Sequence, residues 1–213
     1  NKCITSSAFP NCLKIATVIP LHKNGNVNDV NNYRPISLLP VLSKVFERLM
    51  VEQIPKCFNE NNLFSNNQFG FRKSLSTEKA VLSLIDYVIQ ALQNGDYFLT
   101  TFLDLSKAFD CMSHEILIRK LFFYNFKSVA IRLILSYLSN RIQIVTIDGV
   151  SSDQKEITYG VPQGSILGPL LFLIYVNDLP HFFPHNYSVV QYADDTTIGK
   201  CVSTTELVAP SFL

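Results

Sequence analysis

The sequence is poor in charged residues and lacks any paired cysteine motif. Only 16% of its 213 residues are charged, which is low for a freely soluble surface and indicates that some apolar surface expects a partner. The five cysteines form no Cys-x-x-Cys pair. They therefore indicate reduced thiols in an intracellular protein and argue against a disulfide framework or a zinc site. The four histidines are scattered, and we interpret them as structural or solvated.

The sequence also lacks an apolar run long enough to cross a membrane. Its longest run, residues 166–176, is interrupted by Gly168 and Pro169, whereas a bilayer span takes about 20 residues. No signal peptide is visible, and the first residue is Asn1, so we expect a fragment or a processed piece of a longer chain. Apolar residues still make up 47% of the sequence, enough for a sizeable core and against wholesale disorder.

Charge is unevenly distributed along the chain. Residues 1–80 have a net charge of +5, residues 81–160 of −1 and residues 161–213 of −3. This asymmetry suits a protein that holds phosphates near one end and metal ions near the other. Chance clustering is the preferred explanation if charge is the only signal.

Helices and strands alternate without regular βαβ spacing, which favours an α+β fold with an antiparallel sheet. The clearest helix covers residues 76–94, where Ser76 or Thr77 can cap the start and Gly95 can close the end. Pro55 is expected to kink or end a helix over residues 42–58. Further helices are predicted over 113–125, 128–139 and 165–176, and strands over 15–21, 97–105, 142–147, 156–159 and a hairpin within 187–198.

Three acidic residues are candidates for metal binding. Asp194 and Asp195 lie at the expected tip of the hairpin, and Asp104 lies near the end of the strand over 97–105, which we expect to be buried. If strand and hairpin are neighbours, Asp104 and Asp194 can hold two divalent ions about 3.5–4 Å apart, as phosphoryl transfer requires. Asp195 would then support the site. For Asp104 alone, a turn-capping role is an equally good interpretation, and Asp is also a common turn residue.

Several motifs follow one another between residues 12 and 200. They are residues 32–39 (NYRPISLL), 68–72 (QFGFR), 102–110 (FLDLSKAFD), 160–172 (GVPQGSILGPLLF) and 192–195 (YADD). Together they resemble the reverse transcriptase family, in the form found in non-LTR, LINE-like retrotransposons. The resemblance implies a right-hand polymerase fold. Residues 1–95 would be fingers with part of the palm, and residues 96–213 an incomplete palm whose antiparallel sheet packs on helices, with the thumb absent.

The resemblance also implies a metal site built on the three acids. Asp104 and Asp194 match the two metal-binding aspartates of the family, and Asp195 matches the third acid. The backbone carbonyl of Leu105 is expected to help hold a metal. The implied cofactor is a pair of Mg²⁺ ions, with Mn²⁺ as a possible substitute, acting on a primer 3′-hydroxyl and a dNTP.

Two further matches concern the nucleotide. Phe109 matches the position that packs under the deoxyribose and excludes a 2′-hydroxyl, and Gln163 matches the side chain that touches the nucleotide near its 3′-hydroxyl. Asp110 is expected to be a structural hydrogen-bonding residue. The glycines of the motif over 160–172 would let backbone approach the base pair closely.

Four basic residues match positions that contact phosphates. Arg34 and Lys23 correspond to finger cations that grip the triphosphate, on either side of a hairpin turn. Arg72 and Lys73 are expected near template phosphates or at the start of the helix over 76–94. For Lys23 and Lys73, a solvated surface lysine is an equally good interpretation.

The sequence hypothesis is therefore an RNA-directed DNA polymerase. Its implied partners are an RNA template, a DNA primer, dNTPs and the rest of a longer element-encoded polyprotein, without a membrane. The implied location is intracellular, with action in the nucleus and an RNA-bound cytoplasmic particle as an alternative.

Three alternatives stay open. A catalytically inactive or domesticated remnant, with at most nucleic-acid binding, is motivated by Ser74-Leu75, where the family commonly has Gly-Arg, and by the chain ending at Leu213. An aspartic protease is disfavoured because no Gly follows Asp195-Thr196. A group II intron or telomerase type is less favoured by the contexts of the motifs at 32–39 and 160–172.

Overall fold

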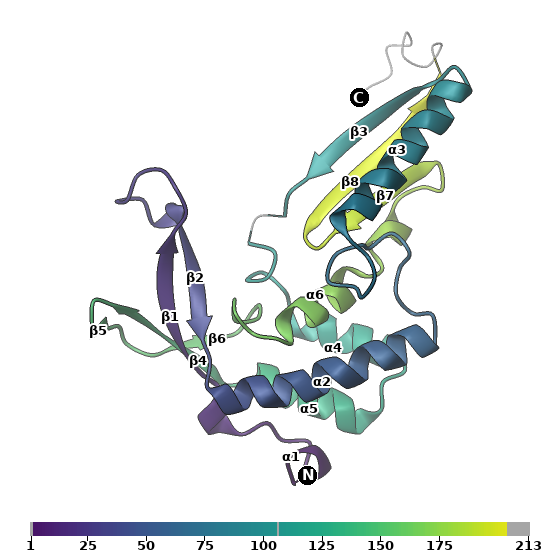
Figure 1. The fold of residues 1–213 in the computed structure, drawn as a ribbon. Coiled ribbons are helices and arrows are strands. Elements are labelled where there is room, and N and C mark those ends of the chain that lie inside the picture. The colour runs from purple at the N-terminus through teal and green to yellow at the C-terminus, as the bar shows by residue number, and fades with distance from the viewer. Residues whose placement is uncertain (1, 106, 204–213) are drawn as a thin grey trace. The chain divides into compact units, whose positions relative to one another are not determined.

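The computed structural model describes residues 2–105 and 107–203 (Figure 1). The chain divides into two compact units, each built from two segments that are far apart in the sequence. The first unit comprises residues 1–63 and 107–175, and the second comprises residues 64–106 and 176–213. This division does not test a boundary between fingers and palm at residues 95–96, which stays a prediction.

The first unit contains a mixed sheet. Its strands are β1 (Ile15–His22), β2 (Tyr33–Leu38), β4 (Arg141–Ile147), β5 (Val150–Ser151) and β6 (Lys155–Ile157). They are ordered β2-β1-β4-β5, with β6 also on β4. All pairs are antiparallel except β1 with β4. The predicted strands over 15–21, 142–147 and 156–159 are therefore present.

Helices supply the apolar core of the first unit. The helices with buried apolar side chains are α2 (Val41–Glu60), α4 (His114–Phe123), α5 (Ser128–Leu138) and α6 (Gly168–Val176), with the short turn η1 (Asn11–Leu13). Helix α1 (Lys2–Thr5) and the turn η2 (Val30–Asn32) bury no residue. The Phe9 ring packs edge-on against Phe46 of α2 and Tyr137 of α5, with centroid distances of 5.8 and 5.1 Å. These contacts join the N-terminal segment to two helices.

Helix α2 does not end at Pro55, contrary to the sequence prediction. It continues to Glu60 with the proline inside. An internal proline costs about 3 kcal/mol because it removes a hydrogen bond and crowds the preceding turn. Ile54 and Phe58 flank it and are buried, and burying two such side chains stabilises the helix by about 1.5–3 kcal/mol each. Packing therefore outweighs the local cost.

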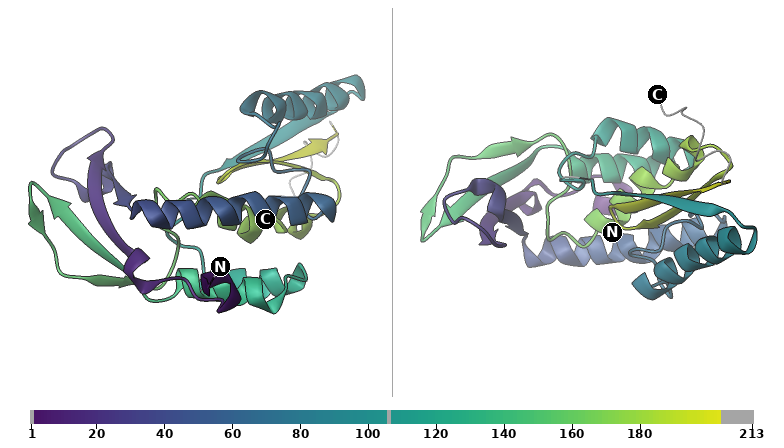
Figure 2. Two further views of the ribbon diagram at one scale, coloured as in Figure 1. Left: turned by 60° about the horizontal axis from the view of Figure 1, so that its bottom comes forward. Right: turned by 90° about the horizontal axis from the view of Figure 1, so that it is seen from above.

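The second unit is a three-stranded antiparallel sheet with one helix along it (Figure 2). The strand order is β3 (Tyr97–Leu103), β8 (Asp195–Val202), β7 (Tyr187–Tyr192), and the turn η3 (Leu179–Phe182) precedes β7. Helix α3 (Thr77–Gln93) packs on β3 and β7. The hydroxyl of Ser76 accepts the Lys79 N–H, and Gly95 has a φ of +75° after the helix, so both predicted ends are confirmed.

Strand β3 is exposed, which contradicts the prediction of a buried strand. Phe102 is 73% exposed, and Asp104 just beyond the strand is also exposed. The physical reason is position: β3 is an edge strand with β8 on one side, and a continuous apolar run does not by itself distinguish an edge strand from a central strand.

Among residues 2–105 and 107–203, no helix has both the length and the apolar character needed to span a bilayer.

Candidate active site

The two adjacent acids lie at a tight hairpin turn, as predicted. The ladder between β7 and β8 ends at the pair Tyr192–Asp195, so Ala193 and Asp194 form the turn. Ala193 has a φ of +58°, a left-handed conformation that side chains adopt only under constraint from their surroundings. Asp194 is half-buried and Asp195 is exposed.

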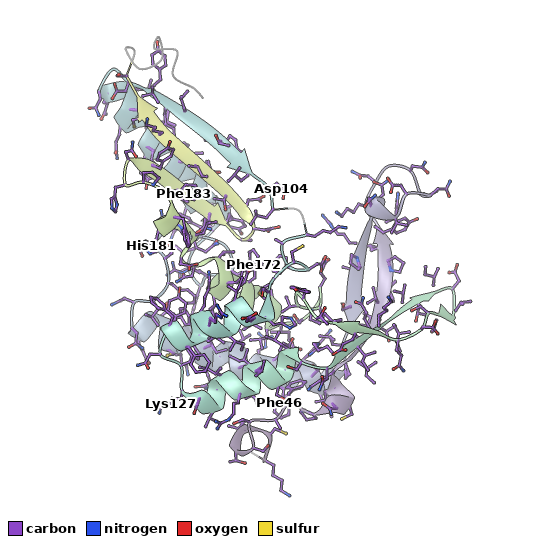
Figure 3. The ribbon with its side chains drawn as sticks, turned by 180° about the vertical axis from the view of Figure 1, so that it is seen from behind. Phe46, Asp104, Lys127, Phe172, His181 and Phe183 are labelled. Atoms are coloured by element: carbon purple, nitrogen blue, oxygen red, sulfur yellow. The ribbon has the colours of Figure 1, made fainter. Side chains whose placement is uncertain are left out.

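The third acid lies at the same end of this sheet. The ladder between β3 and β8 ends at the pair Leu103–Thr196. One step further along both strands places Asp104 opposite Asp195, with Asp194 in the adjoining turn. The prediction that this strand and the hairpin are sheet neighbours is confirmed, and Figure 3 shows Asp104 where β3 ends beside the hairpin.

The three acids are chemically suited to divalent cations, but the structure does not gather them into a closed cage. In the described part of the chain, none of their carboxylates has a hydrogen bond or ion pair that would neutralise it. Oxygen donors of this kind are what Mg²⁺ and related hard cations prefer. No group of three acidic, histidine or cysteine side chains in the described residues is arranged to hold a metal ion. Binding by Asp104, Leu105, Asp194 and Asp195 stays a prediction.

A buried glutamine forms hydrogen bonds to the backbone of the turn at Ala193 and Asp194. Gln68 is 2% exposed, and its Oε1 accepts the N–H of Ala193 at 2.9 Å and that of Gly70 at 2.8 Å. Its Nε2 donates to the Ala193 carbonyl at 3.1 Å. The side-chain amide therefore satisfies both backbone groups of the left-handed residue, which explains how Ala193 is kept in that conformation.

The segment around Gln68 also pairs with strand β7. The Phe69 N–H donates to the Gln191 carbonyl, and the Gln191 N–H donates to the Asn67 carbonyl, at 2.8 and 2.7 Å. Gly70 approaches so closely that an added Cβ would lie 2.2 Å from the Ala193 nitrogen. We interpreted the motif over 68–72 as part of the fingers pattern, and sequence reasoning missed its contact with the turn. No signal in the sequence distinguishes Gln68 from a solvated loop glutamine, because its contacts are 125 residues away.

Arg72 contacts the segment that precedes Gln68. Its Nη1 donates to the Ser65 carbonyl at 2.6 Å, and its guanidinium lies 5.0 Å from the centre of the Phe64 ring. Burial lowers the pKa of Arg72 from its ordinary value. Lys73 is exposed. Contact of Arg72 and Lys73 with template phosphates stays a prediction.

In the first unit, the loop before α6 pairs with the turn that carries Phe109. The Val161 N–H donates to the Phe109 carbonyl at 3.0 Å, and the Gly160 N–H donates to the Met112 carbonyl at 2.8 Å. Gly160 has a φ of +73°, and a Cβ there would lie 2.5 Å from the Phe109 carbonyl oxygen. The Phe109 ring packs against Phe172 of α6, with centroids 4.7 Å apart. Phe109 is thus held by backbone on one side and a ring on the other.

Gln163 is fixed through both its side chain and its backbone. Its Nε2 donates to Asp110 Oδ2 at 2.9 Å, which confirms Asp110 as a structural hydrogen-bonding residue. Its carbonyl accepts the N–H of Ser37 on β2 at 2.7 Å. The next residue, Gly164, has a φ of +124°, and a Cβ there would lie 2.6 Å from the Ser37 carbonyl oxygen.

The two predicted finger cations lie on the β1–β2 hairpin. Arg34 pairs with Leu21 in the ladder, and the Lys23 N–H donates to the Asn32 carbonyl at 2.8 Å to close the loop. Both cationic side chains are exposed. The hairpin itself is confirmed, and the grip on a triphosphate stays a prediction.

The predicted residues fall into two groups by unit. The second unit holds the acids and the template cations: Asp104, Leu105, Asp194, Asp195, Arg72 and Lys73. The first unit holds the nucleotide residues: Lys23, Arg34, Phe109 and Gln163. The roles of both groups stay predictions.

Comparisons with known proteins identify the family. The chain matches the family described as reverse transcriptase (RNA-dependent DNA polymerase) over residues 21–207. It is 34% identical over 205 residues to the RNA-directed DNA polymerase from mobile element jockey of Drosophila melanogaster. It is 35% identical over 208 residues to the probable RNA-directed DNA polymerase from transposon BS of the same species. Both alignments cover 93% of this chain and 22% of the relative, so the chain spans about a fifth of these proteins.

Solved structures support the fold. Apo telomerase from Candida tropicalis, truncated from its C-terminal domain, aligns with a TM-score of 0.64 and 12% identity, over 92% of this chain and 45% of that one. The predicted α+β architecture with an antiparallel sheet is confirmed. The family match and the mobile-element relatives confirm the resemblance on which the sequence hypothesis rests. The chain belongs to the reverse transcriptase family, in the form found in non-LTR mobile elements.

Proposed function

We propose that this chain carries the active-site acids of an RNA-directed DNA polymerase that adds dNTPs to a primer 3′-hydroxyl. The observation that carries the proposal is the register of one sheet. The β3–β8 ladder ends at Leu103–Thr196 and the β7–β8 ladder at Tyr192–Asp195, so Asp104 follows β3 at the end of the sheet where the Asp194 turn lies, in a chain of the reverse transcriptase family. In the described residues, no ion pair neutralises these carboxylates.

The residues that would hold divalent ions are Asp104, Asp194 and Asp195, with the carbonyl of Leu105. Reverse transcriptases generally use divalent metals, and such ions, when bound, lower the pKa of the primer hydroxyl and neutralise charge on the triphosphate. The protein's own contribution is placement. Gln68 holds the turn that carries Asp194, so the carboxylates need little reorganisation when cations and substrate arrive.

We assign the selection of the nucleotide to the first unit. Phe109 is backed by Phe172, so its ring can resist a 2′-hydroxyl by contact and favour dNTPs. Gln163 is held by Asp110 and Ser37, which fixes the side chain proposed to touch the sugar. Template identity would be read by base pairing with the RNA strand.

Arg34 and Lys23 are exposed on the β1–β2 hairpin. Exposed cations on a hairpin suit the grip on a triphosphate that we propose for them.

Primer extension tests the proposal. The protein is produced together with the remainder of its polyprotein and given an RNA template, a DNA primer, dNTPs and Mg²⁺. Asp104→Asn and Asp194→Asn are expected to lower incorporation at least ~100-fold, because metal-held charge is worth several kcal/mol in the transition state. Asp153→Asn, at an exposed acid in the loop before β6, is the matched control and should retain activity. Full activity in Asp194→Asn would refute the proposal.

A binding protein without catalysis is the second candidate, and one observation favours it. Ser74 has a φ of +67° at the position where the family commonly has glycine, so a side chain occupies a backbone conformation that suits glycine better, and Leu75 replaces the arginine that commonly follows. Salt-dependent RNA binding without Mg²⁺-dependent incorporation by the parent protein would support this alternative.

A further inference from the structure

A glutamate in the core of the first unit binds backbone instead of a cation. Glu47 of α2 is 0% exposed. Its Oε2 accepts the N–H groups of Ile166 and Leu167 at 2.6 and 3.1 Å, and its Oε1 accepts the Ser43 hydroxyl at 3.0 Å. No ion pair to this carboxylate is present in the described residues. A buried carboxylate is costly unless it is hydrogen-bonded, so these three bonds explain how the fold tolerates it.

The two backbone donors stand directly before helix α6. Ile166 and Leu167 precede its first residue, Gly168, whose own N–H is accepted by the Ser165 hydroxyl at 3.0 Å. The first N–H groups of a helix have no partner within it, and the start of a helix attracts negative charge. Glu47, more than a hundred residues away in sequence, therefore acts as the cap of α6.

The first N–H group that Glu47 caps, that of Ile166, lies three residues after Gln163 on the same loop. The front of the loop is tied to β2, where the Ser37 N–H donates to the Gln163 carbonyl. The back of the loop is tied to Glu47. Between these two contacts, Gly164 has a φ of +124°. Glycine has no side chain that could stabilise this conformation by a hydrogen bond of its own.

The surroundings of Glu47 are buried. Tyr137 of α5 is 0% exposed, and the charge of Glu47 contributes to raising the pKa of its phenol, after burial itself. Arg141 lies over the Tyr137 ring, 4.7 Å from its centre, and donates to the Tyr137 carbonyl at 3.0 Å. Glu47 therefore lies in a buried environment, and its printed hydrogen bonds are to Ser43 of α2 and to the loop before α6.

We propose that Glu47 is a positioning residue for nucleotide addition. Its carboxylate holds the loop of residues 163–167 against α2, and thereby keeps Gln163 where the incoming dNTP binds. The inference rests on the proposed function. Glu47 itself touches no substrate and acts through the loop.

Hydrogen exchange and single-nucleotide kinetics on the full polyprotein test this role. Glu47→Ala removes both acceptor oxygens, so the amides of Ile166 and Leu167 should exchange at least ~10-fold faster, since each loses its hydrogen bond to the carboxylate. The KM for dNTP should rise about 10-fold with a smaller change in kcat, because the loop is displaced and the acids are not. Glu47→Gln can still accept both N–H groups and can donate to Ser43, so it should restore both values to within ~3-fold.

Control variants distinguish failure of this inference from failure of the proposed function. Glu52→Ala changes an exposed glutamate on the same helix and should leave exchange and KM unchanged. Glu47→Asp, which withdraws the carboxylate by one methylene, replaces Glu47→Ala if the latter does not fold. Unchanged exchange at residues 166 and 167 in the disruptive variant overturns the inference, whether or not the parent polymerises. Faster exchange with an unchanged KM in an active enzyme also overturns it. A parent that incorporates no nucleotide refutes the proposed function, and the exchange result still decides the anchoring of the loop.

Discussion

Replacing Gln68 with leucine should release the turn that carries Asp194. The change keeps a side chain of similar size and removes three hydrogen bonds, two to Ala193 and one to Gly70. Each such bond contributes about 1 kcal/mol net, and a buried backbone group left unpaired costs about 1–3 kcal/mol. Because Gln68 is 2% exposed, water does not readily replace it. We expect Gln68→Leu to lower the free energy of unfolding by about 3 kcal/mol.

The same substitution should affect catalysis beyond stability. Ala193 keeps its left-handed backbone because Gln68 satisfies its N–H and its carbonyl. Without that pairing the turn can relax, and a displacement of about 1 Å at reacting groups costs on the order of 100-fold in rate. Primer extension at a temperature where the variant stays folded should therefore fall about 100-fold.

Gln68→Glu provides a sharper version of the test. One carboxylate oxygen can still accept both N–H groups, but the other would face the Ala193 carbonyl oxygen, which accepts from Nε2 in the parent. The variant should be destabilised at pH 8 and partly rescued at lower pH, where the protonated carboxyl can donate again. The measurements are urea unfolding and primer extension at both pH values, with Asn66→Ala, an exposed change in the same segment, as the control. Gln68→Leu within about 0.5 kcal/mol of the parent, the range of an ordinary surface substitution, would refute the reasoning.

Three further outcomes are expected. Gly70→Ala places a Cβ 2.2 Å from the Ala193 nitrogen and should cost about 1–3 kcal/mol in urea unfolding; a neutral result would show that the segment moves freely. Burial, with the charge of Glu47, raises the pKa of Tyr137 above its ordinary 10.0, so the unfolded chain releases this proton first and stability should fall as the pH rises above 10; Tyr137→Phe should remove that part of the slope. Phe109→Ala should raise the use of rNTPs relative to dNTPs at least ~10-fold in competing incorporation assays, and unchanged selectivity would rule out its proposed steric role.

Local patterns were enough to predict the helix over 76–94 and the hairpin that carries Asp194 and Asp195. The helix over 76–94 has its cap at Ser76 and its closing Gly95 within the segment itself, so no distant contact was needed. The hairpin around Asp194 is likewise short and local. That Asp104 joins it followed from motif order, and the ladder between β3 and β8 supplied the register.

Other features depend on distant packing and could not be predicted. The contacts of Gln68 and Glu47 join segments 125 and 119 residues apart, and neither residue differs in sequence from a solvated helix or loop side chain. The exposure of β3 depends on its place at the edge of a sheet. The continuation of α2 past Pro55 depends on the burial of Phe58.

The pairing of Gln68 with Ala193 also orders events during synthesis. Its two partners are separated by 125 residues, so the loop between them must close before the turn is held, and contacts of such long range form slowly. While the ribosome is still making that stretch, Gln68 and Gly70 have no turn to hold. The turn before β8 can therefore reach its final geometry only after residue 193 has been synthesised, however early Gln68 and Gly70 are made.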